Sequence, residues 1–311
     1  MPLTLGITKE LPEPANNERL RILIGASDYT EHVGFASAAI YSSQATDSKQ
    51  KGRCMGGTVF LMYHEIEAPG RELMRKEPGY VRYAVREQDF RAQMGGLEEA
   101  AWKGMSVGEA VGFGPQKGVG ITFDDGCETD RMVAADLLSR LGFGATFYVT
   151  VGFLGKGGSL KVQQLRELDS LGFEIGCHSM THAYLTDLGE ADLRRETGEA
   201  KAKLEDFLGR RIEHFSCPGG RYDQRVIEQV KEAGYSTMCN SRSHSNQPTT
   251  SVYALGRVPV LRETTLPSFQ RSCRGQGLWA AQLGAALRNG GKQVLGNAAY
   301  DKMRQMMLRN R

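Results

Sequence analysis

Two adjacent carboxylates, Asp124 and Asp125, directly follow the apolar run VGITF at residues 119–123. Charged groups at the end of a buried strand are costly unless another group compensates their charge. A divalent cation would do so, with one Asp as its ligand and the other as a base. The alternative is a helix N-cap, a position where Asp is common for ordinary reasons. The pair alone leaves both interpretations open.

Two histidines, His178 and His182, follow the apolar run FEIGC at residues 173–177. Their spacing lets both imidazoles face one way on a single helical turn, which suits one metal ion. Pairs with this spacing are often incidental. Together with one Asp, however, the two histidines would make a three-ligand site that leaves positions open for water and substrate.

A tight loop is predicted at Pro218, Gly219 and Gly220, after the run IEHFSC at residues 212–217. A backbone N–H in such a fixed loop, near Gly219, would be able to face a developing oxyanion. The alternative is an ordinary strand-to-helix turn in which Asp223 is the N-cap of the next helix.

From Thr58 onward the chain alternates between short apolar runs and helical segments. Strands are predicted at residues 59–64, 119–123, 144–151, 173–177, 212–217, 235–239 and 253–260. Helices are predicted at about residues 86–102, 132–141, 160–171, 190–208 and 223–233. This alternation predicts a parallel α/β arrangement, and about seven strands favour a barrel. Because barrel chemistry lies at the carboxyl ends of the strands, the motifs above all fall where it is expected.

Residues 1–52 are predicted to be a loosely ordered N-terminal extension, and residues 53–311 a domain that ends in a basic helical tail. The N-terminus lacks the basic start and apolar core of a signal peptide, and no apolar run is long enough to cross a bilayer. We therefore expect a cytoplasmic protein without an integral membrane segment. A net charge of only +3 argues against nucleic acid as a partner. The six cysteines include no C-x-x-C pair and are expected to be free thiols.

The motifs TFDDG (122–126), HSMTH (178–182) and the Pro-Gly-Gly loop occur in the order and spacing of the NodB-homology polysaccharide deacetylases, carbohydrate esterase family four. The runs LMYHEI, GATFYVTVGFLG and LGRVPV also resemble that family, so that the resemblance covers about residues 56 to 262. It implies a distorted (β/α)7 barrel. It also implies a hydrolase of carbon–nitrogen bonds other than peptide bonds, which removes acetyl groups from the N-acetylated amino sugars of an oligo- or polysaccharide.

The resemblance also implies roles for individual residues. Asp124 matches the family's general base, which takes a proton from the attacking water. Asp125, His178 and His182 match its three ligands for a divalent metal, usually Zn²⁺. The metal and a backbone N–H near Gly219 would hold the oxyanion.

Two positions depart from the family pattern. Ser216 stands where the family commonly has an Arg that orients the base, and Arg221 is a candidate replacement. The late Leu-x-His motif that supplies the general acid is not visible, which leaves His244 as the candidate acid. These departures favour an alternative, a catalytically impaired sugar-binding relative, whereas the intact base and ligand set argues against it. A further alternative is deacetylation of an O-acetyl ester or a non-sugar amide.

The substrate cleft has four candidate lining residues. Tyr63 and His64 end the first predicted strand, where they would either line the cleft or pack its rim. Pro218 and Arg221, in and directly after the Pro-Gly-Gly loop, are the other two candidates for substrate binding.

Overall fold

The computed structural model describes residues 57–113, 117–278 and 282. The predicted extension at residues 1–52 and the predicted basic tail lie outside these residues. No helix of the described part is long and apolar enough to cross a membrane.

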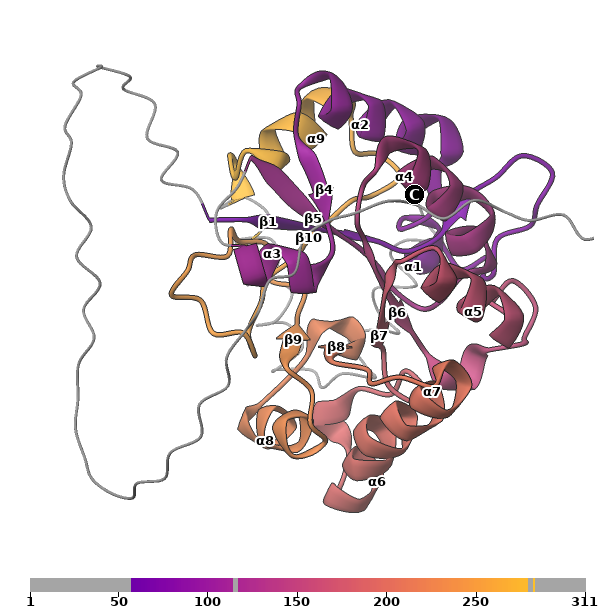
Figure 1. The fold of residues 1–311 in the computed structure, drawn as a ribbon, viewed down its shortest axis with the longest axis vertical. Helices are drawn as coiled ribbons and strands as arrows, with labels where there is room; N and C mark the ends of the chain where they lie inside the picture. The colour runs from indigo at the N-terminus through magenta and orange to yellow at the C-terminus, as the bar shows by residue number, and fades with distance from the viewer. Residues whose placement is uncertain (1–56, 114–116, 279–281, 283–311) are drawn as a thin grey trace, which may run out of the picture. The chain divides into compact units, whose positions relative to one another are not determined.

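One curled parallel sheet organises the described residues (Figure 1). Its strands run in the order β10-β1-β5-β6-β7-β8-β9, and β4 pairs with the first half of β5. Every pairing in this sheet is parallel. The strands are β1 (Val59–Tyr63), β4 (Lys103–Met105), β5 (Gly118–Phe123), β6 (Thr146–Val149), β7 (Glu174–Cys177), β8 (His214–Ser216), β9 (Thr237–Cys239) and β10 (Val258–Pro259).

The segment that leads into β10 connects the two edge regions of the curled sheet and so closes the barrel. Leu255 forms a parallel bridge with Cys239 of β9, and three residues later Val258 pairs with Leu61 of β1. Arg257 therefore lies between the first and last strands of the sheet, level with the middle of β1. The predicted fold, a distorted (β/α)7 barrel, is confirmed.

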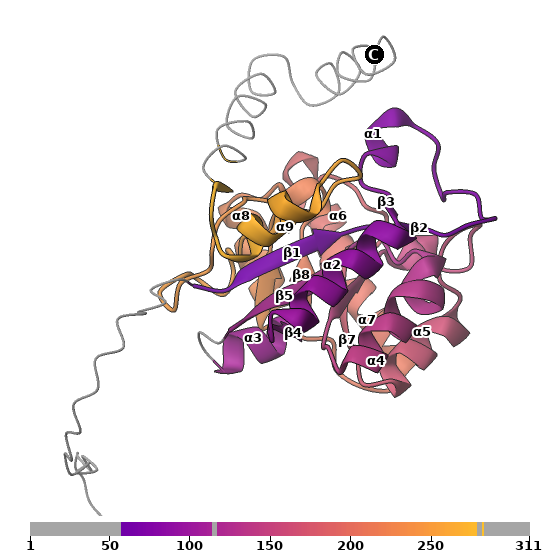
Figure 2. The ribbon, with the colours of Figure 1, turned by 90° about the horizontal axis from the view of Figure 1, so that it is seen from above.

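Helices cover the outer face of the sheet in Figure 1, and Figure 2 shows α2 and α9 side by side. The helices of the described residues are α1 (Pro78–Val81), α2 (Glu87–Glu99), α3 (Val107–Phe113), α4 (Ala135–Leu141), α5 (Val162–Ser170), α6 (Glu190–Arg194), α7 (Ala200–Leu208), α8 (Gln224–Glu232) and α9 (Leu266–Cys273). Of these, α3 packs Val107 and Ala110 into the cluster on the inner side of the sheet. Strands β2 (Ile66–Glu67) and β3 (Val85–Arg86) form a small separate sheet.

The helix predicted at residues 190–208 is interrupted. A π-helical turn, Arg195–Glu199, separates α6 from α7. A π turn inserts one residue into the helical repeat and so changes which side chains face inward. This turn brings Glu196, only 1% exposed, to the site described below.

Two layers of side chains hold the sheet. Tyr63, Phe123 and Phe147 stack across β1, β5 and β6 in the outer layer, with successive ring centroids 5.3 and 4.9 Å apart. The inner layer includes Phe60 and Tyr148, which belong to a separate buried cluster. Successive residues of a strand point to opposite faces, so both faces of these strands are buried and each strand is apolar throughout.

Candidate metal and catalytic centre

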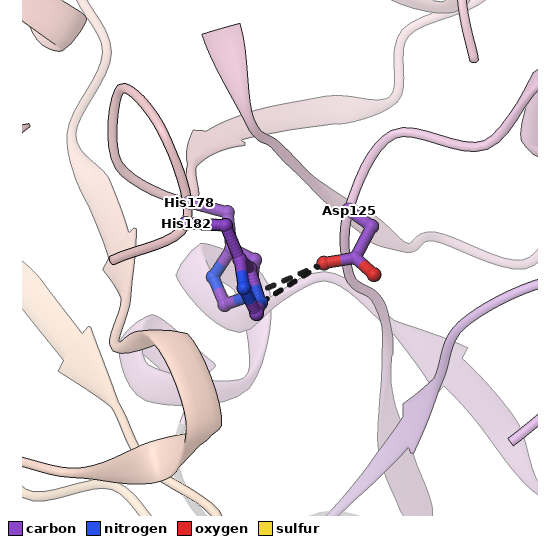
Figure 3. Close-up of side chains that lie close together, drawn as sticks. All are labelled: Asp125, His178 and His182. Carbon is purple, nitrogen blue, oxygen red and sulfur yellow. Dashed lines mark ion pairs between the residues drawn. The ribbon is translucent and has the colours of Figure 1, made fainter. Parts of the chain in front are cut away.

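Asp125, His178 and His182 lie close together at the carboxyl ends of β5 and β7 (Figure 3). Asp125 Oδ1 is 3.3 Å from His182 Nε2 and 3.6 Å from His178 Nε2. One ligand atom from each residue falls within 4.8 Å of the other two. Since β5 and β7 both pair with β6, the parallel sheet brings these distant positions to one edge.

The backbone around this cluster is unusual. Asp125, Ser179 and His182 have positive φ angles of 79°, 66° and 65°. Non-glycine residues in this region cost about 1–3 kcal/mol each and concentrate at functional sites. The prediction that the two histidines share a helical turn is wrong: residues 178–182 form an irregular loop, and its two left-handed residues turn the imidazoles toward one another.

Buried groups fix this loop from behind. Glu196 accepts hydrogen bonds from the backbone N–H of Thr181 at 2.8 Å and from its hydroxyl at 2.7 Å. His178 Nδ1 lies 2.8 Å from the Ser216 carbonyl, which can only accept, so Nδ1 carries the proton. The other nitrogen, Nε2, therefore faces the cluster as a potential ligand, as second-shell contacts arrange in metal sites.

The cluster fits a divalent cation. Asp125 Oδ1 is buried and has no hydrogen-bond partner among the described residues. A buried carboxylate oxygen without a partner is costly. Burial lowers the pKa of His178 to about 4, so its imidazole is in the neutral form that ligates metals. One oxygen and two imidazole nitrogens, with positions left open, suit zinc or a similar ion.

Asp124 is held by a residue to which sequence reasoning gave no role. Arg257 donates from Nη1 to Asp124 Oδ1 and from Nη2 to Oδ2, both at 2.7 Å. The Arg257 side chain is fully buried, and Nη2 also donates to the Ser216 hydroxyl at 2.8 Å. A signal was present in the sequence, because an Arg within the apolar run 253–260 needs a buried partner.

This pairing decides the charge of Asp124. Burial alone would raise the pKa of its carboxyl group, but attraction to the Arg257 guanidinium outweighs burial and holds the pKa below its ordinary value. Asp124 is therefore ionised at neutral pH. Its Oδ2 lies 3.9 Å from His178 Nε2, beside the metal cluster.

His64 follows β1 and faces the same centre. Its Nδ1 is buried and has no hydrogen-bond partner among the described residues. Burial lowers the pKa of His64, while the negative charges of Asp125 and Asp124 act to raise it. The ring of Tyr83 lies against His64, with centroids 4.6 Å apart.

The Pro-Gly-Gly loop follows β8 at the same edge of the sheet. Pro218 is buried, and Gly219 has φ 62°. A Cβ at Gly219 would lie 2.7 Å from Cε1 of Tyr184, so only glycine fits there without a shift. Arg221 stacks on Tyr184, with Cζ 3.6 Å from the ring centroid. The expectation that Arg221 orients Asp124 is wrong, because Arg257 fills that position.

Two further predicted residues lie elsewhere. Tyr63 is fully buried in the outer layer and donates its hydroxyl to Gln93 at 2.8 Å, so it packs the core and does not line a cleft. His244 Nδ1 lies 3.3 Å from the Ser245 carbonyl, and its ring lies against Gly256. Among the described residues, no recorded contact joins His244 to the metal cluster or to Asp124.

The chain is similar to known polysaccharide deacetylases. The family model for polysaccharide deacetylases matches residues 112–238. The chain is 26% identical to the Bacillus subtilis protein YxkH over 206 residues, which is 64% of this chain and 70% of that one. It is 34% identical to a peptidoglycan-N-acetylglucosamine deacetylase of Bacillus cereus over 125 residues, 40% of this chain and 56% of that enzyme.

A solved structure shares the fold. The deacetylase PplD of Streptococcus pyogenes, in complex with acetate, superposes with a TM-score of 0.62. The match covers 70% of this chain and 98% of PplD, at 19% identity.

Proposed function

We propose that this chain is a polysaccharide deacetylase, a hydrolase of carbon–nitrogen bonds other than peptide bonds, and that it removes acetyl groups from N-acetylated amino sugars of an oligo- or polysaccharide. The observation that carries the proposal is an ionised Asp124, clamped by Arg257, beside the cluster of Asp125, His178 and His182.

Asp125, His178 and His182 would hold a divalent cation, and we propose Zn²⁺ because imidazole nitrogen and carboxylate oxygen are its usual ligands. When bound, such a cation polarises a carbonyl group and makes a nearby water easier to deprotonate. The Ser216 carbonyl and Glu196 keep the ligands oriented.

Asp124 would accept the proton of the attacking water. The carboxylate is ionised, and Oδ2, which accepts a hydrogen bond from Arg257 alone among the described residues, has a second lone pair for this proton, whereas Oδ1 also accepts from the Ser216 hydroxyl at 3.5 Å. The bidentate contact also fixes the plane of the carboxylate, so that little reorientation is needed during proton transfer.

The backbone N–H of Gly219 would stabilise the negative charge that develops on the carbonyl oxygen. A preorganised donor of this kind contributes about 3–4 kcal/mol to catalysis in comparable sites. The left-handed conformation of Gly219 and its contact with Tyr184 hold the loop in one shape.

The leaving amine needs a proton, and we assign its delivery to His64 in place of His244: the neutral imidazole would take up the proton that Asp124 removes from the attacking water and pass it to the amine. His64 follows β1 at the carboxyl edge of the sheet, where the charges of Asp125 and Asp124 act on it, and its Nδ1 has no hydrogen-bond partner among the described residues. His244 has its recorded contacts with Ser245 and Gly256 instead. Two groups expected from the family pattern, the Arg that orients the base and the His that protonates the leaving group, are missing at their usual positions in the sequence. In this proposal Arg257 and His64 take their places, so these departures no longer favour a catalytically impaired sugar-binding relative.

Acetate release from oligomers of N-acetylglucosamine tests the proposal. The protein would be stripped of metal, reloaded with Zn²⁺, and compared with Asp124→Ala and with Asp206→Ala, an exposed Asp on α7. We expect release that depends on metal and falls about 10²- to 10⁴-fold in Asp124→Ala only, the usual contribution of a general base. Acetate release from O-acetylated xylan, without release from the N-acetylglucosamine oligomers, would contradict the proposed N-acetylated substrate. The absence of both release and zinc binding would overturn the enzymatic proposal.

A further inference from the structure

Two cations share one aromatic ring next to the proposed metal ligands. Arg75 Cζ lies 4.8 Å from the ring centroid of Phe153, and Lys156 Nζ lies 5.8 Å from it. The ring of Phe153 is stacked on His182, with centroids 6.1 Å apart and an angle of 29° between the planes. Both positive charges therefore lie one ring beyond the proposed metal centre.

The fold holds these groups at the carboxyl edge of the sheet. Phe153 ends a 3-10 turn that directly follows β6. The loop after this turn packs on Met74, whose Sδ accepts a hydrogen bond from Ser159 at 3.1 Å. The backbone N–H of Met74 in turn donates to the buried carboxylate of Glu65 at 3.0 Å. Arg75 is thus anchored by its neighbour in the chain.

The two cations differ from their neighbours in lacking a counter-charge. Arg71 and Lys76 form ion pairs with Glu128 and Glu72. Among the residues that the structure describes, no carboxylate lies within ion-pair distance of Arg75 or Lys156. A cation–π contact contributes about 0.5–1 kcal/mol at an exposed site, and it does not relieve the repulsion between two like charges over one ring.

We propose that Arg75 and Lys156 form a subsite for an anionic group, a carboxylate or a phosphate, on the sugar that is deacetylated or on the sugar next to it. The substrate would then be an acidic glycan. This inference rests on the proposed function and deepens it by naming the substrate class. Arg75, partly buried, supplies a planar fork that suits two oxygens of one anion, and the exposed Lys156 adds a second, adjustable charge.

Kinetics with three substrates of equal length test the subsite. They are a neutral N-acetylglucosamine oligomer, one that alternates with N-acetylmuramic acid and so carries carboxylates, and one that carries phosphate esters. The double variant Arg75→Gln/Lys156→Gln would be compared with Arg140→Gln/Lys203→Gln, which removes two exposed cations from α4 and α7. Arg140 lies in the last turn of α4, at the end of the barrel from which the strands start.

The native protein should prefer one or both anionic oligomers, measured as the ratio of kcat/KM to that of the neutral oligomer. This preference should fall about tenfold in Arg75→Gln/Lys156→Gln, mainly through KM, and persist in the control variant. It should also weaken with added salt. If the double variant loses the preference for only one of the two anionic oligomers, the anionic group of that oligomer, carboxylate or phosphate, is the one that the subsite binds. No preference in the native protein, or an equal preference in the double variant, would overturn the inference.

Two further measurements keep the inference separate from the proposed reaction. Lys156→Glu, at an exposed position, should lower the anion preference below that of the native protein, and an unchanged preference would count against the inference. If no oligomer releases acetate, calorimetry would compare the binding of the two anionic oligomers to the zinc-loaded native protein and to the zinc-loaded double variant. Weaker binding by the double variant would support the subsite although the reaction proposal has failed, and equal binding would overturn it.

Discussion

Arg257 clamps both carboxylate oxygens of Asp124 at 2.7 Å, although the two residues are 133 positions apart in the chain. The guanidinium comes from the segment that closes the barrel between β9 and β1. Ser216, at the position where the family commonly has an Arg, accepts a hydrogen bond from the same guanidinium at 2.8 Å. A positive charge is thus retained beside the proposed base but is supplied from another strand.

Arg257→Lys should lower kcat/KM about 10- to 100-fold, because an ammonium group cannot bind both carboxylate oxygens in one plane. Arg257 depresses the pKa of Asp124, so its weakening raises that pKa, and the acid limb of the pH profile should move to higher pH. Arg262→Lys is the matched control, since Arg262 pairs with Glu67 at 2.7 Å outside the centre. An unchanged pH profile in Arg257→Lys would contradict a role for Arg257 in orienting and ionising Asp124.

Zinc should bind once per chain and stabilise the protein by about 2.7 kcal/mol at a free concentration one hundred times the Kd. His182→Ala removes one of three ligands and should abolish this stabilisation, whereas His244→Gln should retain it. Thermal unfolding with and without a chelator, together with calorimetric titration, measures both effects. Equal stabilisation of His182→Ala by zinc would place the metal elsewhere.

His64→Gln should lower kcat about 10²- to 10⁴-fold while zinc affinity stays the same, because the leaving amine loses its proton donor. His244→Gln should change kcat by no more than about twofold, as expected outside the reacting atoms. Single-turnover acetate release by the two zinc-loaded variants checks this pair. A large loss in His244→Gln, with His64→Gln near the native rate, would return the acid role to His244.

Gly219→Ala should lower kcat by more than its loss of folding stability explains. The left-handed backbone costs a Cβ-bearing residue about 1–2 kcal/mol, and the added methyl would also meet Tyr184 at 2.7 Å. Gly142→Ala has the same backbone penalty, at φ 63°, but nothing lies within 4 Å of the added atom. Gly219→Ala should lose at least as much unfolding free energy as Gly142→Ala, and only Gly219→Ala should lose kcat. Equal kcat in the two variants would count against an oxyanion-binding loop at Gly219.

Glu174→Gln should destabilise the protein in a pH-dependent way. The Glu174 carboxylate, at the start of β7, accepts hydrogen bonds from Thr146 at 2.6 Å and Ser106 at 3.1 Å and lies 3.1 Å from His214 Nε2. Burial alone would raise its pKa, but the contacts with His214 and the hydroxyls outweigh burial and lower it. A carboxyl group with a depressed pKa stabilises the fold above its unfolded pKa of about 4.3 and loses that contribution as the pH falls.

Urea unfolding should therefore show a loss of about 1.5–3 kcal/mol for Glu174→Gln at pH 7, the usual range for hydrogen bonds to a charged group. The difference from the native protein should shrink below about pH 4. Glu190→Gln, on the exposed surface of α6, should show little change at either pH. A Glu174→Gln loss that is the same at pH 7 and pH 3.5 would contradict the role of the charge.

The sequence by itself determined the fold and the membership of the cluster that we propose to hold a metal. Short apolar runs separated by helices left few alternatives to a parallel barrel, and parallel strands bring their carboxyl ends to one edge. Asp124, Asp125, His178 and His182 each follow such an end, so the topology brings them to one edge, and the left-handed backbone at Ser179 and His182 then turns the imidazoles toward one another.

Only the tertiary structure decided which side chains face this centre from the uniformly buried segments. The run VFLMY has no alternation of polar and apolar residues, so its pattern could not tell that Tyr63 points to the outer layer. Arg221 and Arg257 both lie near strand ends in the sequence, and only the closure of the sheet through Leu255 and Val258 brings Arg257 to Asp124. The partner of a buried charge is set by distance in space, which sequence spacing does not record.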